Sequence, residues 1–314
     1  MPIDLKTNEI DVAIHIKKIA TCGGHRAAIY ALAPGRDERH FLTGGGDGWI
    51  VEWNMDNPEN GKLVALIEDR VFSLCRLPGQ NRLVAGNMTG GVHWIDLDAP
   101  TQTLNVQHHI NKGVFDVLAV GQWVFTAGGD GLLTRWEAAT GRTLESLQLS
   151  GLALRSLSYS EQRSELAVGA SDHSIYVLDV QSFKIKKVIC EAHSNSVFAV
   201  SWSPDSRRLV SGGRDAMLKI WDASDDFALG KALPAHLFTI NNIAWSPDGR
   251  LLATASRDKT VKIWDAATFE LLKVIDSMRV GGHVNSANRL LWLPDALVSC
   301  SDDRTAVIWS VEAP

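Results

Sequence analysis

The sequence predicts an all-β chain that is built from seven copies of one four-stranded unit. Five segments repeat the order His, Thr or Ser, Asp and Trp at nearly constant spacing, and two more align with the ends of these units although they lack the Trp. Short alternating apolar stretches recur between turn residues, whereas no window of useful length has apolar residues at sustained helical spacing. These observations favour one repetitive domain over the two domains that a length of 314 residues would suggest.

The five complete copies are each marked by four residues. They are His25, Thr43, Asp47, Trp53; His109, Thr126, Asp130, Trp136; His193, Ser211, Asp215, Trp221; His236, Thr254, Asp258, Trp264; and His283, Ser299, Asp303, Trp309. In the copy that ends at Trp136, His108 competes with His109 for the His place. Spacing alone leaves that choice open.

The two faint copies fill the gaps between the complete ones. Residues 92–96 and 175–179 align with residues 261–265, so Ile95 and Leu178 take the place of the Trp. The seven markers at 53, 95, 136, 178, 221, 264 and 309 are then separated by 42, 41, 42, 43, 43 and 45 residues. The faint copies also lack most of the polar marker residues. Loss of a whole hydrogen-bond network costs little folding free energy, whereas each buried polar group left without a partner costs about 1–3 kcal/mol.

Each unit divides into four short strands with turn signals between them. In the unit that starts at His193, residues 197–202 alternate toward a core, and residues 203–206 form a Ser-Pro-Asp turn. Residues 208–211 and 217–221 make the second and third strands, joined by a turn over 212–215, and a fourth strand follows near residues 231–233. The next unit repeats the pattern with strands over 240–245, 251–254 and 260–264.

The composition, with 45% hydrophobic and 21% charged residues, is that of an ordinary soluble globular protein. The net charge of 31 − 36 = −5 gives no general reason to expect a nucleic-acid or anionic-membrane partner. No basic segment followed by a long apolar run opens the chain, and no stretch reaches the roughly 18 apolar residues of a membrane helix, so we expect a cytoplasmic protein. The four cysteines, Cys22, Cys75, Cys190 and Cys300, lack zinc-site spacing and are expected to be buried thiols.

The repeat resembles the WD40 family. Trp221-Asp222 and Trp264-Asp265 match the WD ending, Gly24-His25 and Gly282-His283 match the GH ending, and a period of about 40–45 residues is typical of its four-stranded blades. The resemblance covers roughly residues 10–314. Seven units then imply a single-domain, seven-bladed β-propeller.

Blade boundaries follow from the markers. We expect blades at about 25–67, 68–108, 109–150, 151–191, 193–234 and 236–277, and a seventh blade made of 283–311 plus 12–20. Too few residues follow Trp309 to supply a fourth strand, whereas residues 14–19 precede the first unit without a blade of their own. The N-terminal segment is therefore expected to complete the seventh blade and close the ring, which removes exposed sheet edges.

The repeated polar residues could suggest a hydrolase triad, but repetition argues against catalysis because an enzyme needs one preorganised constellation. The resemblance implies a structural chain in which Asp accepts from His, His from the Ser or Thr hydroxyl, and that hydroxyl from the Trp indole. The Gly-rich segments 44–48 and 128–131 lead into strands and lack the ending of a phosphate loop, so they are interpreted as tight turns. We expect neither a cofactor nor a metal.

Partner contacts in this family are expected at the rim of the central channel, near the start of each first strand and at the residue before each turn Asp. These two rim positions vary between the units, whereas packing positions repeat. The candidate binding residues are Tyr30, Phe72, Phe115, Arg155, Phe198, Arg214, Asn241, Arg257 and Asn288. Such a rim suits a protein or peptide with an apolar anchor beside an acidic or phosphorylated residue. In the plainer alternative, the aromatic residues plug the channel mouth and the arginines pair with Asp302 or water.

The sequence thus favours a noncatalytic protein-interaction scaffold. A propeller enzyme of hydrolase or quinoprotein type would need an unrepeated polar cluster at the channel, and none is evident. A nucleic-acid-binding scaffold is disfavoured by the net charge, although the rim arginines keep it open. The sequence does not distinguish the rim from the blade edges as the interface.

Overall fold

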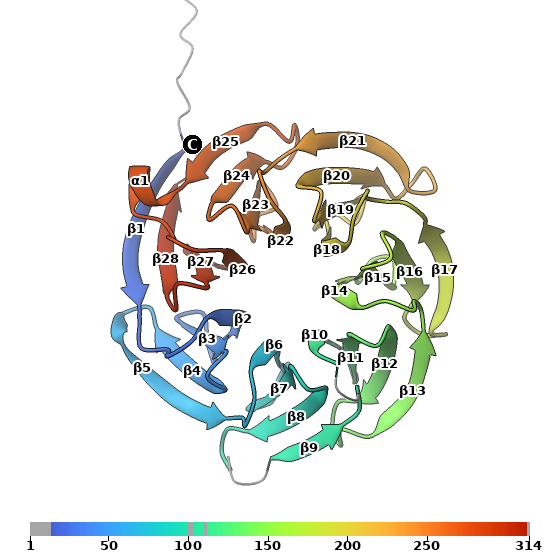
Figure 1. Ribbon diagram of the computed structural model, residues 1–314, viewed down its shortest axis with the longest axis horizontal. Helices are drawn as coiled ribbons and strands as arrows, with labels where there is room; N and C mark the ends of the chain where they lie inside the picture. Colours follow the sequence, from blue (N-terminus) through green and yellow to red (C-terminus); the bar gives the residue numbers. More distant parts are fainter. Residues whose placement is uncertain (1–13, 100–102, 110–111, 313–314) are drawn as a thin grey trace, which may run out of the picture.

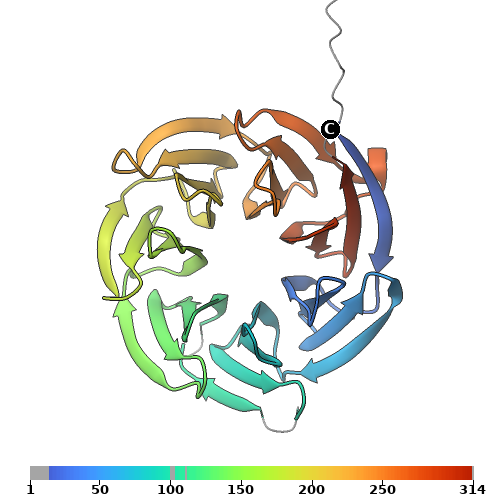
Figure 2. The ribbon, with the colours of Figure 1, turned by 180° about the vertical axis from the view of Figure 1, so that it is seen from behind.

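Seven antiparallel sheets form a closed ring in the computed structural model, which describes residues 14–99, 103–109 and 112–312 (Figure 1). Each sheet has four strands, of which the first lies nearest the centre of the ring and the fourth forms the outer edge (Figure 2). The predicted fold class, an all-β seven-bladed propeller, is confirmed.

The first four blades use consecutive strands. Blade 1 holds β2 (Ile29–Pro34), β3 (His40–Gly45), β4 (Trp49–Asn54) and β5 (Asn57–Leu66). Blade 2 holds β6 (Val71–Arg76), β7 (Arg82–Asn87), β8 (Gly91–Asp96) and β9 (Leu104–Gln107). Blade 3 holds β10 (Val114–Val120), β11 (Trp123–Gly128), β12 (Leu132–Glu137) and β13 (Thr143–Gln148). Blade 4 holds β14 (Leu154–Ser160), β15 (Glu165–Ala170), β16 (Ile175–Asp179) and β17 (Lys184–Ile189).

The last three blades include the closure of the ring. Blade 5 holds β18 (Val197–Trp202), β19 (Arg208–Gly213), β20 (Met217–Asp222) and β21 (Ala228–Pro234). Blade 6 holds β22 (Ile240–Trp245), β23 (Leu251–Ser256), β24 (Val261–Asp265) and β25 (Leu271–Ile275). Blade 7 holds β26 (Ala287–Leu293), β27 (Ala296–Ser301), β28 (Ala306–Glu312) and the N-terminal strand β1 (His15–Cys22).

Strand β1 closes the ring as the sequence predicts. It pairs antiparallel with β28, from His15 opposite Glu312 to Cys22 opposite Ala306. Residues 12 and 13 of the predicted closing segment lie outside the described residues. The two ends of the described chain therefore lie in one sheet, and the outer edge of β28 is paired with β1.

The apolar core lies between neighbouring blades. Ile29, Phe41 and Trp53 of blade 1, for example, pack with Val298 and Ile308 of blade 7, and all five are at most 2% exposed. Each blade thus buries its faces against the next one, which is how a ring of small sheets acquires a continuous core.

Two details differ from the sequence analysis. A single four-residue helix, α1 (Ser277–Val280), occurs among the described residues, in the connection from blade 6 to blade 7. It is capped by the Asp276 side chain, which accepts hydrogen bonds from the amides of Met278 and Arg279. The expectation of four buried thiols is correct for Cys22 and Cys300. It is wrong for Cys190, which follows the outer strand β17 and is exposed, and Cys75 is only half-buried.

Candidate functional site

The repeated polar residues form the same hydrogen-bonded chain in five blades. In blade 1, His25 Nδ1 lies 3.0 Å from Asp47 Oδ2, His25 Nε2 lies 2.8 Å from Thr43 Oγ1, and the Trp53 indole donates to Thr43 Oγ1 at 2.9 Å. The equivalent contacts in blades 3, 5, 6 and 7 are made by His109, Thr126, Asp130, Trp136; His193, Ser211, Asp215, Trp221; His236, Thr254, Asp258, Trp264; and His283, Ser299, Asp303, Trp309.

These chains stabilise the turns between strands. Asp215 also accepts hydrogen bonds from the amides of Ser194 and Met217, so one carboxylate joins two loops of blade 5. Burial by itself would raise the pKa of Asp215, but the hydrogen bond and charge of His193, with these amides, lower it to about 2. The Ser211 hydroxyl lies between His193 and Trp221, where it is buried and fully engaged. It is therefore not presented to a substrate.

Blades 2, 3 and 4 show how the pattern varies. His109, and not His108, contacts Asp130 and Thr126, while His108 Nε2 lies 2.9 Å from Thr134 Oγ1. In blade 2, a different pair replaces the chain: Asn87 Nδ2 lies 3.1 Å from His93 Nε2, and burial lowers the pKa of His93 to about 4.

In blade 4, the surviving Asp172 accepts from the Ser174 amide at 3.0 Å and from the Tyr176 hydroxyl at 2.7 Å. The faint copies thus replace the chain with local hydrogen bonds, although the buried Trp94 indole of blade 2 has no hydrogen-bond partner among the described residues.

A β-bulge points one residue of every first strand toward the central channel. The register of the first and second strands shifts by one residue in all seven blades, and the seven predicted residues at the strand starts are the extra residues of these bulges. A bulge redirects the side chain that it inserts. The bulge residues are Tyr30, Phe72, Phe115, Arg155, Phe198, Asn241 and Asn288.

These seven side chains, together with Arg289, line one pocket of about 140 Å³ at the channel mouth. All seven are half-buried. Tyr30 and Phe72 meet edge to face with centroids 5.0 Å apart, and Phe72 stacks on Phe115 at 5.6 Å. The pocket therefore has a continuous aromatic wall along blades 1 to 3.

Arg155 continues this wall as a cation. Its guanidinium lies 4.2 Å from the ring centroid of Phe115 and 5.0 Å from that of Phe198, and its Nε donates to Ser171 Oγ at 2.9 Å. Burial and then the charge of Arg214 lower the pKa of Arg155. Among the described residues, no carboxylate forms an ion pair with Arg155. The pocket thus contains a partly buried positive charge that no acidic group of the described chain neutralises.

The second predicted rim position lies beside the first in every blade. Its amide donates to the carbonyl of the residue two places before the bulge, as Arg214 does to Ser196 at 2.9 Å and Arg257 does to Thr239 at 3.0 Å. Arg214 and Arg257 are exposed and lie outside the lining of the pocket. Neither pairs with Asp302, which instead accepts from Asn288 Nδ2 at 2.8 Å. Positive charge therefore gathers at blades 4 to 6, and the acidic group lies at blade 7.

The sequence analysis missed the group beneath the pocket. Arg289 of β26 donates to the Phe115 carbonyl at 2.9 Å and pairs with Asp116 of β10 at 3.3 Å. Asp116 also accepts from the Leu157 amide of blade 4 at 2.8 Å. The available signal was the position after the bulge, which is Ala, Ser or Asn in the other five blades and charged only at Asp116 and Arg289.

No group of three or more His, Cys, Asp or Glu side chains among the described residues is arranged to hold a metal ion. In the same part of the chain, no helix is long and apolar enough to span a membrane.

Comparison with known proteins identifies the repeat. Residues 16–54, 184–222, 228–265 and 275–310 match the WD40 family, described as WD domain, G-beta repeat. The chain is a WD40-repeat protein. The four matched stretches contain four of the five complete polar chains of this WD40 propeller, and the stretch with His109 and Trp136 lies outside them.

Two similar proteins align with parts of this chain. Telomerase protein component 1 of Rattus norvegicus is 27% identical over 215 residues, which are 65% of this chain and 8% of that protein. Target of rapamycin complex subunit LST8-1 of Arabidopsis thaliana is 33% identical over 98 residues, or 31% of this chain and 32% of that protein. The chain thus spans less than a third of either relative.

The solved WD40 β-propeller domain of Doa1 has a TM-score of 0.83, with 18% identity over 94% of this chain and 97% of that one. This likeness shows the shared fold.

Proposed function

We propose that this WD40 propeller is a noncatalytic scaffold that binds a segment of a partner protein on the channel-rim face. Proteins with this repeat mostly serve protein interaction, and one relative is by name a subunit of a larger complex. The pocket formed by the bulge residues supplies what interface hot spots use, namely aromatic rings and arginine at a concave centre.

The observation that carries the proposal is the position of Arg155. Its guanidinium lies between the rings of Phe115 and Phe198, and it lacks an ion-pair partner among the described residues. A partly buried cation without a counterion is costly, and an incoming anion relieves that cost. We therefore propose that the bound segment places an acidic or phosphorylated side chain at Arg155 and an apolar side chain against Tyr30 and Phe72.

In this proposal, the rim pocket is closed at its base and does not open into the rest of the channel. Arg289 and Asp116 join opposite sides of the channel beneath the bulge residues. A partner would therefore insert one or two side chains from the rim and would not thread through the ring. This favours a short linear segment or a loop tip as the binding element.

The test is affinity capture from cell extract with the double variant Phe198→Ala, Arg214→Ala. We expect partners of the wild-type protein to be lost, because truncation of such hot-spot residues typically costs about 2 kcal/mol or more each. The matched control is Lys184→Ala, Ile185→Ala, which removes one cation and one exposed apolar side chain from the outer strand β17. Capture that is equal for wild type and the rim variant would contradict the proposal.

The acidic preference is tested separately, by phosphatase treatment of the extract. Loss of capture would identify a phosphorylated anchor, and unchanged capture would leave a carboxylate as the anchor. Retention of DNA or RNA that falls steeply with salt and disappears in the rim variant would instead support a nucleic-acid scaffold.

A further inference from the structure

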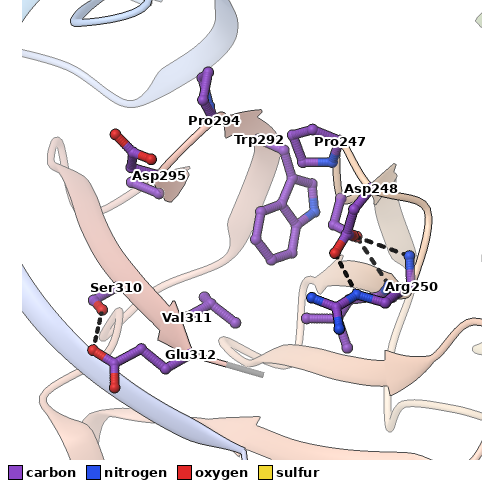
Figure 3. Close-up of a pocket in the computed structure, with 12 residues that line it drawn as sticks. Pro247, Asp248, Arg250, Trp292, Pro294, Asp295, Ser310, Val311 and Glu312 are labelled. Atoms are coloured by element: carbon purple, nitrogen blue, oxygen red, sulfur yellow. Dashed lines mark hydrogen bonds and ion pairs between the residues drawn. The ribbon is translucent and has the colours of Figure 1, made fainter. Parts of the chain in front are cut away.

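A hollow of the described surface lies between blades 6 and 7, at the seam where the ring closes. It has a volume of about 440 Å³, and Figure 3 shows the Trp292 ring at its centre, with Pro247 and Arg250 on one side and Val311 and Glu312 on the other. The turns that form it lie at the ends of the first and third strands, whereas the rim residues lie at the start of the first strand. This seam groove is therefore on the face opposite the rim pocket.

The seam groove has a smaller counterpart between blades 5 and 6. That neighbouring groove has a volume of about 200 Å³ and eight lining residues, and seven of the eight have an equivalent in the lining of the seam groove. The informative equivalents are Trp245 and Trp292, Ala266 and Val311, and Arg208 and Leu251. The difference in volume thus arises between sites of the same architecture.

The neighbouring groove is filled by two side chains of the protein itself. Arg208 Nη1 lies 3.3 and 3.4 Å from the carbonyls of Ala266 and Ala267, and its guanidinium lies 5.3 Å from the Phe269 ring centroid. Phe269 packs edge to face with Trp245 at 6.4 Å. The contact between blades 2 and 3 repeats the first of these interactions, because Arg82 Nη1 donates to the Ala139 carbonyl at 2.8 Å.

Both filling side chains are missing at the seam. Leu251 stands where blade 5 has Arg208. Among the described residues, blade 7 has no counterpart of the turn that carries Phe269 in blade 6, because β28 and β1 continue as an extended pair, with Val311 opposite Ile16. Within the described part of the chain, no aromatic ring packs on Trp292 as Phe269 packs on Trp245.

The groove margin carries negative charge. Asp248 pairs with Arg250 at 2.5 Å, and the exposed Asp295 lies 3.6 Å from Arg39. Glu312 is exposed and forms no ion pair with a described residue. Three carboxylates therefore surround a groove of mixed polarity whose own cation, Arg250, is already paired, and an incoming cation is favoured there.

We propose that the seam groove binds a partner segment through an arginine side chain next to an aromatic one. The arginine takes the place that Arg208 has in the neighbouring groove, beside Trp292 and the carboxylates of Asp295 and Glu312. The aromatic ring packs on Trp292 as Phe269 packs on Trp245. The contacts of Arg208 and Phe269 in the neighbouring groove thus indicate which side chains the ligand should have. The seam groove is separate from the rim pocket.

The test uses a capped peptide of sequence Ser-Gly-Phe-Arg-Gly-Ser and the ¹⁵N resonance of the Trp292 indole, assigned with Trp292→Phe. We expect this resonance to move on titration to millimolar peptide. A peptide with Gln in place of Arg should bind at least about tenfold more weakly, because it loses its charge-assisted contacts. Equal affinity for the two peptides, or no movement of the resonance, would overturn the proposal.

Two variants and one control locate the site. Leu251→Arg places an internal arginine in the groove and should abolish peptide binding. Because Leu251 is buried, the exposed pair Asp295→Lys, Glu312→Lys is a second variant, which should also abolish binding while the fold is kept. The control, Asp225→Lys, Glu270→Lys, makes the same charge change on exposed residues of blades 5 and 6 and should bind like wild type. Binding that survives in the Asp295, Glu312 variant would refute the site. The rim variant Phe198→Ala, Arg214→Ala should still bind the peptide, so failure of one proposal does not decide the other.

Discussion

Arg289 and Asp116 form an ion pair of 3.3 Å across the central channel, although 173 residues separate them in the chain. The pair joins blade 7 to blade 3. Both side chains are mostly buried, at 19% and 16% exposure, and burial raises the pKa of Asp116 despite the charge of Arg289. The contact therefore ties opposite sides of the ring at the base of the rim pocket.

This relationship predicts energetic coupling between the two residues. Asp116→Ala and Arg289→Ala should each lower the free energy of unfolding by about 1–3 kcal/mol, because each leaves a partly buried charge without its partner. The double variant should lose less than the sum of the two. Urea denaturation of all four proteins measures the coupling, and strictly additive losses would mean that the pair contributes nothing.

The polar chains should matter to stability in proportion to how complete they are. His193→Ala and His236→Ala should each destabilise by about 1–3 kcal/mol, because Asp215 or Asp258 loses a buried donor. Ser150→Ala, in the faint blade 4, removes an acceptor for the Leu152 amide and a hydrogen bond to Asp172, but it should cost less because Asp172 keeps the Ser174 amide and the Tyr176 hydroxyl as donors. Chemical denaturation compares the three. Equal losses would contradict the assignment of complete chains to blades 5 and 6.

The lowered pKa of Asp215 implies that the free energy of unfolding depends on pH. Its pKa in the folded protein is about 2, against an ordinary value of 3.8, so its contribution to stability is fully present above about pH 4. That contribution is lost as the pH falls through 2. The difference in unfolding free energy between wild type and Asp215→Asn should therefore be constant from pH 7 to about 5 and shrink below pH 4. A difference that stays constant down to pH 2 would show that the carboxylate charge is not what stabilises the turn.

Removal of residues 1–20 should damage the fold far more than the loss of an ordinary terminus. It removes most of β1 and exposes the ladder edge of β28. We expect aggregation by light scattering, or a large fall in melting temperature. A truncated protein that stays monomeric and equally stable would argue against closure by β1.

Much of this architecture follows from sequence period alone, because each blade repeats the same turn chemistry and strand alternation. The bulge residues were also identifiable, since they occupy one register that varies while the position before it stays apolar. The contact between Arg289 and Asp116 was not, because it depends on the diameter of a closed ring. The choice between His108 and His109 depends on which imidazole reaches Asp130, which is a matter of loop geometry.

The seam groove was unpredictable for another reason. It arises from what the seam lacks, namely an arginine like Arg208, which Leu251 replaces in blade 6, and a turn in blade 7 that carries a ring like that of Phe269. An alignment of the repeats compares residues that are present. It therefore does not reveal a hollow that arises because side chains are missing where the ring closes. The exposure of the Cys190 side chain was also not predictable, because it depends on the loop that follows the outer strand β17.

The central claim, that a partner lies on the channel rim, is tested most directly by site-specific photo-crosslinking. A benzoylphenylalanine placed at Phe72 lies in the aromatic wall of the rim pocket, whereas one at Ile185 lies on the exposed outer strand β17. We predict a crosslinked partner from position 72 that is absent from position 185 and that disappears when Arg155→Ala is added. Crosslinks from position 185 alone, or a crosslink from position 72 that is indifferent to Arg155, would contradict the account.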